Sequence, residues 1–218
     1  MRYTYLMLAL WRACFAALLL SGGNAQAAGA YVTLDLPGRV SVEIPRNWTV
    51  LSESQKVTLD AFVQAKTEER KKAAGDDSIS RLGFAANYYD EASKVASLFN
   101  VRYIAGQTVT QKELQSYTAA EMSEVNELLR PELTAGVEMV GNKVLSWQPA
   151  RLTVVDGLAA ILVDYRRSSP QGGAFRVRIL RVLDGPESFS VTMGYRESSD
   201  KLLLEAIADR VLRTVKRR

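Results

Sequence analysis

The sequence contains no histidine and a single cysteine, and these absences narrow the chemistry available to the chain. Without histidine there is no Ser–His–Asp triad, no Cys–His dyad and no His-ligated zinc site. The side chain that most often carries protons near neutral pH is missing as well. The single cysteine, Cys14, lies near the amino terminus, so residues 15–218 have no thiol, no disulfide and no cysteine metal site. Histidine- and cysteine-dependent enzymes are therefore excluded.

Nucleotide and metal motifs are also missing. Gly172-Gly173 is not followed by Lys-Ser/Thr, and no G-x-G-x-x-G occurs, which excludes the usual phosphate-binding loops. The acidic pairs Asp76-Asp77 and Asp90-Glu91 do not continue into the ordered spacing that a calcium loop requires, and turn chemistry explains them better. A catalytic Ser–Lys dyad at Ser93-Lys94 is not supported either. Adjacent residues on a strand point to opposite faces, so these two side chains could not pair there. We expect no cofactor and no metal.

The first 27 residues have the pattern of a secretory signal peptide. Arg2 and Arg12 supply positive charge, residues 13–20 are apolar, and Ala25-Gln-Ala27 is an A-x-A cleavage site. The alternative is an uncleaved membrane anchor, but eight apolar residues fall short of the roughly 20 that span a bilayer. Cys14 lies in the middle of this segment rather than at the cleavage point, which argues against a lipoprotein. We expect a mature chain of residues 28–218 without a transmembrane span.

The charge of the mature chain is close to neutral. The full chain has 28 basic and 24 acidic residues, and the signal segment contains two of the arginines, so the net charge falls from 28 − 24 = +4 to 26 − 24 = +2. This does not favour nucleic acid as a partner. For an exported chain, the absence of disulfides favours a bacterial periplasm over eukaryotic secretion, and we expect the periplasm of a Gram-negative bacterium. Its length is sufficient for one domain that needs no disulfide, and we predict a single domain.

The stretch 152–195 predicts an antiparallel meander, because three alternating apolar runs follow one another closely. They are Gly157–Arg166, Phe175–Leu183 and Phe189–Tyr195. Asp156-Gly157, just before the first run, is a strong hairpin signal. A helix with an apolar stripe follows from about Asp200 to Lys216, with Lys216-Arg217-Arg218 at its negative end.

Earlier segments extend this pattern. Residues 31–36 and 39–44 predict a hairpin with a turn at Pro37-Gly38, a stop at Pro45 and Trp48 at the edge of the core. Capping boxes at Ser52/Gln55 and Thr110/Glu113 predict helices, the first to about residue 72 and the second to about Leu129, ended by Pro131. Further strands are expected at 81–89, 95–104 and 143–155, the last interrupted near Pro149. The predicted fold class is α+β: an antiparallel sheet (meander plus N-terminal hairpin) flanked by helices, like an α/β/α sandwich.

The meander also has the one patterned polar feature. If the apolar faces of its three strands coincide, the opposite face presents Asp164 together with four arginines. They are Arg166, Arg176, Arg178 and Arg196. Arginine forks suit carboxylate and phosphate groups, which makes these four residues a candidate patch for an anionic partner. The alternative is a solvated outer face whose arginine stems cover apolar surface.

Aromatic residues form a second feature. Tyr88, Tyr89 and Tyr103 fall on the middle strands, and Trp48 and Trp147 lie elsewhere. Core packing explains them most simply, and an aromatic-lined pocket is the alternative.

Three short segments resemble the PsbP/DcrB-like group of α/β/α sandwiches. They are Ile44-Pro-Arg-Asn-Trp48 after the hairpin, the turn Asp156-Gly157, and the stretch from Asp184-Gly185 through Val215. The resemblance implies an antiparallel sheet flanked by helices. Members of that group are mostly non-enzymatic accessory subunits, import or assembly factors and envelope proteins. The lipoprotein cysteine of some envelope members is missing here, which implies a free periplasmic protein.

We therefore expect an exported, non-enzymatic binding or accessory protein of the bacterial cell envelope, and assign no catalytic residue. Its partner would be an envelope protein, an anionic lipid or an acidic glycan; the oligomeric state is left open. The alternative is a histidine-independent periplasmic hydrolase that uses paired carboxylates. A deep cleft with two facing acids would favour the hydrolase, and a shallow arginine-lined face would favour binding.

Overall fold

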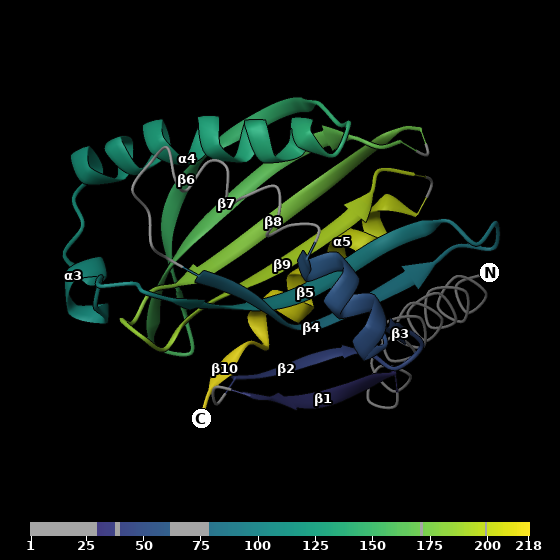
Figure 1. Ribbon diagram of the computed structural model, residues 1–218, viewed down its shortest axis with the longest axis horizontal. Helices are drawn as coiled ribbons and strands as arrows, with labels where there is room; N and C mark the ends of the chain where they lie inside the picture. Colours follow the sequence, from purple (N-terminus) through teal and green to yellow (C-terminus); the bar gives the residue numbers. More distant parts are fainter. Residues whose placement is uncertain (1–29, 38–39, 62–78, 171, 199) are drawn as a thin grey trace, which may run out of the picture.

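The structure is a computed structural model that describes residues 30–37, 40–61, 79–170, 172–198 and 200–218. Two antiparallel sheets form its framework (Figure 1). The larger sheet has the order β3-β4-β5-β9-β8-β7-β6, and the smaller has the order β1-β2-β10. The larger sheet comprises β3 (Thr49–Val50), β4 (Ile79–Tyr89), β5 (Val95–Ala105), β6 (Val144–Val155), β7 (Leu158–Ser168), β8 (Ala174–Val182) and β9 (Ser188–Arg196). The smaller comprises β1 (Tyr31–Leu36), β2 (Val40–Pro45) and β10 (Lys216–Arg217).

Helices cover both faces of the seven-stranded sheet. Helices α3 (Gln111–Gln115) and α4 (Ala119–Met139) lie on one face, and α5 (Lys201–Arg213) lies on the other with the small sheet (Figure 1). Residues 53–61 are also helical. The predicted α+β class, with an antiparallel sheet between helices, is confirmed. The N-terminal hairpin belongs to the separate small sheet.

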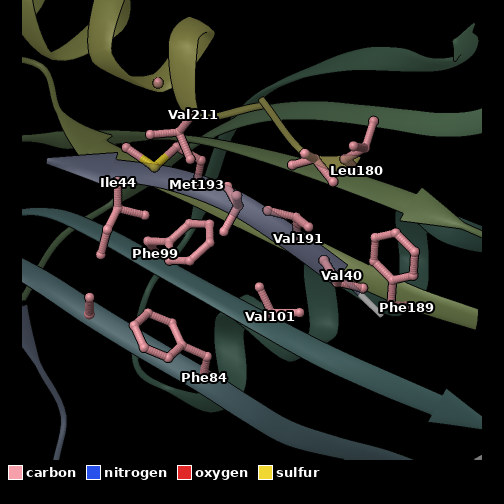
Figure 2. Packing of buried hydrophobic residues seen from close by; sticks show 14 of the residues in the cluster. Val40, Ile44, Phe84, Phe99, Val101, Leu180, Phe189, Val191, Met193 and Val211 are labelled. Carbon is pink, nitrogen blue, oxygen red and sulfur yellow. The ribbon is translucent and has the colours of Figure 1, made fainter. Parts of the chain in front are cut away.

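The first core lies between the large sheet and the layer made by β2 and α5. Phe84 and Phe99 come from β4 and β5, and Val191 and Met193 come from β9 (Figure 2). From the other layer, β2 contributes Val40, Val42 and Ile44, and α5 contributes Leu204, Ala208 and Val211. Every one of these side chains is at most 9% exposed. The apolar stripe predicted for the last helix is thus the face that it buries.

The second core lies beneath α3 and α4. Ile161, Val163 and Tyr165 of β7 and Val177 of β8 pack against four buried residues of the two helices. Those four are Leu114, Met122, Leu129 and Val137. Because each face of the sheet is covered, both sets of alternating side chains on a central strand can be buried.

The predicted meander is confirmed, and its first turn has the expected geometry. Asp156 and Gly157 both have positive φ, 50° and 78°, as a type I′ turn requires. Strands β6 to β9 then follow one another as neighbours. The predicted interruption near Pro149 is a register shift between Gln148 and Arg151 in the β6–β7 pairing.

The assumption that the apolar faces of all three meander strands coincide is wrong. In β7 and β8 they do, because Val163 is paired with Ile179. In the β8–β9 ladder, however, Leu180 is opposite Val191 and Arg178 is opposite Met193. The apolar series of β9 therefore faces α5, whereas the apolar series of β8 begun by Phe175 faces α4. In a sheet covered on one side only, the apolar side chains of all three strands would have to point to that side. This sheet is covered on both sides, so the apolar side chains of neighbouring strands can point to different faces.

The N-terminal predictions hold where the structure describes them. Strands β1 and β2 pair from Tyr31↔Pro45 to Leu36↔Val40, and Trp48 is 6% exposed within the first core. The Ser52 N–H donates to Gln55 Oε1 (2.8 Å), and the Gln55 N–H donates to Ser52 Oγ (3.3 Å), so the capping box forms. The signal segment 1–27, the turn at Gly38 and the helix beyond residue 61 lie outside the described residues.

Two helix predictions need correction. Helix α3 stops at Gln115, and a second capping box, Thr118/Glu121, begins α4, which continues through Pro131 to Met139. Leu129 and Val137, on either side of the proline, are both buried, so packing onto the sheet outweighs the backbone hydrogen bond that proline removes. Just after the helix, a φ of +76° at Gly141 lets the Gly141 and Asn142 N–H groups donate to the Glu138 and Val137 carbonyls.

The last helix is shorter than predicted. It ends at Arg213, and Lys216 and Arg217 form β10 beside Ser41 and Val40. Arg217 forms ion pairs with Asp184 and Glu187, and Arg218 pairs with Asp35 (2.9 Å). Arg217 and Arg218 therefore fasten the carboxyl terminus to the β8–β9 connection and to β1, and β10 pairs with β2.

Within the described ranges, no helix combines the length and apolar character needed to cross a bilayer.

Candidate functional site

The four arginines predicted as one patch do not lie together. Arg166, Arg176 and Arg178 project from the face of the sheet that α5 covers. Arg196 is opposite Phe175, whose ring belongs to the core beneath α4, so it projects from the other face. The prediction of a shared face is therefore wrong for Arg196, because the phase of β9 is reversed.

Arg176 and Arg178 are held in an ion-pair network between the sheet and α5. Arg176 donates to both carboxylate oxygens of Asp164, at 3.0 and 2.8 Å, and to Glu205 at 2.9 Å. Arg178 donates to Asp164 at 3.3 Å and to Glu205 at 3.0 Å, and it also pairs with Asp209. We call these five residues the α5 network.

The α5 network is largely shielded from solvent. Asp164 is 5% exposed, and the side chains of Arg176 and Arg178 are 20% and 12% exposed. The Asp164 carboxylate, which accepts two hydrogen bonds from Arg176, raises the pKa of that guanidinium above its ordinary value. Buried charges of this kind are stable only when paired, so these arginines serve internal contacts.

Arg166 and Arg196 also have internal partners. Arg166 donates to Glu197 at 2.8 Å, although its side chain is 45% exposed. Arg196 donates to the Asp90 carboxylate at 2.9 Å and to the Val95 carbonyl at 2.7 Å, which ties the end of β9 to the β4–β5 turn. Unlike the other three, Arg196 lines a cleft.

This cleft, of about 440 Å³, lies at the end of the molecule where β4 turns into β5. The β2–β3 connection, the end of β9 and the first turns of α5 also contribute lining residues. We call it the end cleft. It is lined by Asn47, Trp48, Tyr88, Asp90, Glu91, Ala92, Ala96, Arg196, Ser198, Asp200, Leu203, Leu204 and Ile207. Leu203 is 63% exposed at its rim, whereas the neighbouring Leu204 is 3% exposed.

Local sequence explains how the walls of the end cleft are held. The Asp90 N–H donates to the Lys94 carbonyl, and the Lys94 N–H donates to Asp90 Oδ1 at 2.8 Å, which closes the β4–β5 turn. Ser93 has a φ of 57° within it. On the opposite wall, Pro45 ends β2 and its carbonyl accepts from the Trp48 N–H at 3.2 Å. The acidic pair Asp90-Glu91 thus has the turn role that was predicted for it.

In the part of the chain that the structure describes, four charged side chains line the end cleft. The Asp90–Arg196 pair is neutral as a unit, which leaves Glu91 and Asp200, both exposed, as unbalanced carboxylates. Trp48, Tyr88 and Leu203 supply apolar wall. Among the described residues, no group of three or more acidic side chains is placed to hold a metal ion. The arrangement can bind a molecule with an apolar part.

A second hollow, of about 400 Å³, lies between the start of α4 and β6. It is shallower than the end cleft and mostly apolar, with Tyr117, Met122 and Leu152 in its lining. Asn126 closes its base, because its amide donates to the Ala150 carbonyl at 3.0 Å and accepts from the Ala150 N–H. We regard it as a surface depression beside an edge strand and consider the end cleft the stronger candidate.

Core packing, the simpler explanation of the aromatic residues, is confirmed for Trp48, Tyr88, Tyr103 and Trp147. Trp48 and Tyr88 line the end cleft. Tyr103 instead donates to the Pro37 carbonyl, and Trp147 stacks on Tyr165 with ring centroids 6.1 Å apart. Leu203 and Asp200 were not predicted. The one available signal was Leu202-Leu203-Leu204, three successive leucines, of which a single helix face can bury only part.

Comparisons with known proteins give limited similarity. No protein-family model matches the sequence, and no curated protein is similar to it in sequence. A solved structure from Bacteroides thetaiotaomicron VPI-5482 aligns over 85% of this chain at 12% identity and a TM-score of 0.44. This chain covers 48% of that protein, about half its length. LpqN of Mycobacterium tuberculosis, described as involved in cell envelope biogenesis, aligns over 85% of this chain and 89% of its own at 12% identity and a TM-score of 0.43.

Proposed function

We propose that the chain is an exported, non-enzymatic binding protein of the bacterial cell envelope, and that it binds its ligand in the end cleft. One observation carries the proposal: the end cleft combines an aromatic and aliphatic wall with a few charged groups, in a volume of about 440 Å³. Ligand sites have this composition and are commonly about 300–1,000 Å³ in volume.

The compartment is part of the same proposal. The pattern of residues 1–27 favours export, and the absence of cysteine after Cys14 suits a periplasmic protein. Residues 28–218 as a single domain and the resemblance to the PsbP/DcrB-like group stay predictions. Both agree with a binding or accessory role.

The rival function is a hydrolase with paired carboxylates, favoured by the presence of Asp90, Glu91 and Asp200 in one cleft. Asp90 is already engaged by Arg196 and by the Lys94 N–H. Glu91 and Asp200 are exposed to water. A general acid needs a carboxyl group whose pKa is raised by burial or by a neighbouring charge. Exposed carboxylates suit electrostatic attraction of a ligand better than proton transfer.

The test is to fill the end cleft and follow what the protein retains. Ala92 is exposed in the lining, so Ala92→Trp should occupy the cleft with little effect on folding. The matched control is Ala119→Trp, at another exposed alanine that lines the shallow hollow beside α4. Both tagged variants and the wild type are captured from native envelope, and the retained peptides, lipids and small molecules are identified by mass spectrometry.

We expect a ligand retained by the wild type and by Ala119→Trp but lost from Ala92→Trp. Equal retention by all three proteins would contradict the proposal. Release of a hydrolysed product by the wild type, lost in Asp200→Asn, would favour the rival instead.

A further inference from the structure

We infer that the ligand of the end cleft is a cation with an apolar body, that is, a protonated amine or guanidinium attached to a hydrocarbon or aromatic part. This inference rests on the proposed function and names the ligand class of the same site. It is the opposite of the anionic partner that the arginines suggested when the sequence was read alone.

The described residues that line the end cleft include more acidic than basic side chains. Arg196 is the one cation among the described residues of the lining, and its guanidinium is 2.9 Å from the Asp90 carboxylate. Only 13% of the Arg196 side chain is exposed, so little of this charge is open to an incoming anion. Glu91, from the β4–β5 turn, and Asp200, from the start of α5, remain exposed and give the described residues of the lining a net charge of −2.

The helix dipole of α5 opposes the negative charge of the lining. The amino terminus of α5 reaches the end cleft, and a helix amino terminus carries a partial positive charge of about half a unit. Asp200 is the N-cap residue of α5, so a full negative charge lies at the same place. Together with Glu91 it outweighs the partial charge, and the opening favours a cation.

The apolar wall of the end cleft indicates that the ligand also has an apolar body. Trp48 and Tyr88 belong to or pack against the first core and meet the cleft, while Leu203 is held at the rim with 63% of its surface exposed. An exposed leucine beside aromatic rings gains free energy if a ligand removes its apolar surface from water. Aromatic rings also attract cations through their faces. A body of a few carbons next to one positive charge fits both parts of the lining.

Probes of one chain length and three charges test the ligand class directly. Octylamine, octanol and octanoate are titrated into Trp147→Phe protein, in which Trp48 is the remaining tryptophan after residue 27. Its fluorescence then reports on the cleft. Calorimetry on the unmodified protein repeats the measurement, so that a folding defect of the variant does not decide the result. The peptides acetyl-Leu-Lys-Leu-amide and acetyl-Leu-Glu-Leu-amide show whether the cation is presented by a peptide or by a small molecule.

We expect octylamine to bind at least about tenfold more tightly than octanoate, with octanol between them. The double variant Glu91→Lys/Asp200→Lys should reverse this order. The matched control, Glu124→Lys/Glu127→Lys, makes the same charge change at two exposed glutamates of α4 and should keep the preference for the amine. Binding of octanoate as tight as that of octylamine, or the same preference in the reversed variant, would overturn the inference.

The two proposals fail separately. If Ala92→Trp abolishes retention of the native ligand while octanoate is preferred over octylamine, the end cleft is a binding site and the ligand class is wrong. If Ala92→Trp leaves retention unchanged, the proposed function itself is wrong.

Discussion

Two parts of the molecule use arginine in different ways. In the α5 network, Arg176 and Arg178 are shared among three carboxylates between the sheet and α5 and are largely hidden from solvent. At the end cleft, Arg196 pairs with the Asp90 carboxylate, and two further carboxylates, Glu91 and Asp200, are exposed. The first group is satisfied internally. The second has charge and apolar surface left over for a ligand.

The comparison teaches that the type and spacing of charged residues do not identify a binding surface. All four arginines come from the meander, yet the phase of β9 and the position of α5 give them different partners. A binding site is identified by the charged groups and apolar surface that neighbouring residues leave exposed. In this chain that criterion selects the end cleft.

The largest expected effect is loss of stability when the buried carboxylate of the α5 network, Asp164, is removed. Asp164→Ala leaves Arg176 and Arg178 with Glu205 as their one shared carboxylate and removes the more deeply buried of the two, so we expect the free energy of unfolding to fall by about 3–5 kcal/mol, as for other broken buried pairs. Asp209→Ala is the matched control, since that side chain is 48% exposed, and it should cost under about 1 kcal/mol. Urea denaturation measures both. Similar losses from the two variants would mean that the network does not depend on burial.

Neighbouring leucines on α5 separate folding from binding. Leu204→Ala should cost about 2–5 kcal/mol, because Leu204 is 3% exposed within the first core. Leu203→Ala should change stability by no more than about 0.5 kcal/mol and yet weaken retention of the ligand. Urea denaturation and capture from the envelope measure the two properties. A Leu203→Ala protein that is stable and retains its ligand fully would show that Leu203, at the rim of the end cleft, does not contribute to binding.

A smaller effect is expected when the three sheet residues of the α5 network are replaced together. Asp164→Leu/Arg176→Met/Arg178→Leu exchanges ions for apolar side chains, which is often neutral or stabilising by about 1–4 kcal/mol. Ligand retention should be unchanged, because none of the three residues lines the end cleft. Loss of binding in a stably folded triple variant would show that the two regions are coupled.

The smallest effect concerns alkaline pH. Burial raises the pKa of Tyr195, which lies beside the α5 network, above its ordinary value of 10.0. The folded protein therefore holds this proton more tightly than the unfolded chain does, so the contribution to stability is complete below pH 10 and is lost as pH rises through the folded pKa. Tyr195→Phe should show a shallower fall in melting temperature than the wild type between about pH 9.5 and 11.5, a range that begins just below the ordinary tyrosine pKa and extends above it. An identical slope in both proteins would contradict this.

Much of the fold could be predicted because local signals determine it. Asp156-Gly157 requires two positive φ angles and forms the predicted turn, and Ser52/Gln55 forms its capping box. The prediction that Pro131 ends the helix was wrong. The cost of a proline in a helix can be judged from local sequence, whereas the burial of Leu129 and Val137 depends on tertiary packing that the sequence does not show. Gly141 was an available stop signal for the same helix.

The candidate site was harder to predict because it depends on relations between distant segments. Strand alternation assigned Arg166, Arg176 and Arg178 to one face correctly, but the phase of β9 relative to β8 is a property of the covered sheet. Trp48, Asp90 and Asp200 come from three separate connections, and no spacing rule joins them. The aromatic residues were noted as a pocket alternative, and the acidic rim was not.

The most direct test of the central claim is site-specific photocrosslinking in the native envelope. A photoreactive amino acid is placed at Leu203, on the rim of the end cleft, and in a control protein at Leu128, which is 74% exposed on α4 and does not line the cleft. The account predicts a defined crosslinked species from position 203 that disappears when Ala92→Trp is added and does not arise from position 128. Equal crosslinking from both positions, or a product at position 203 that persists with Ala92→Trp, would contradict it.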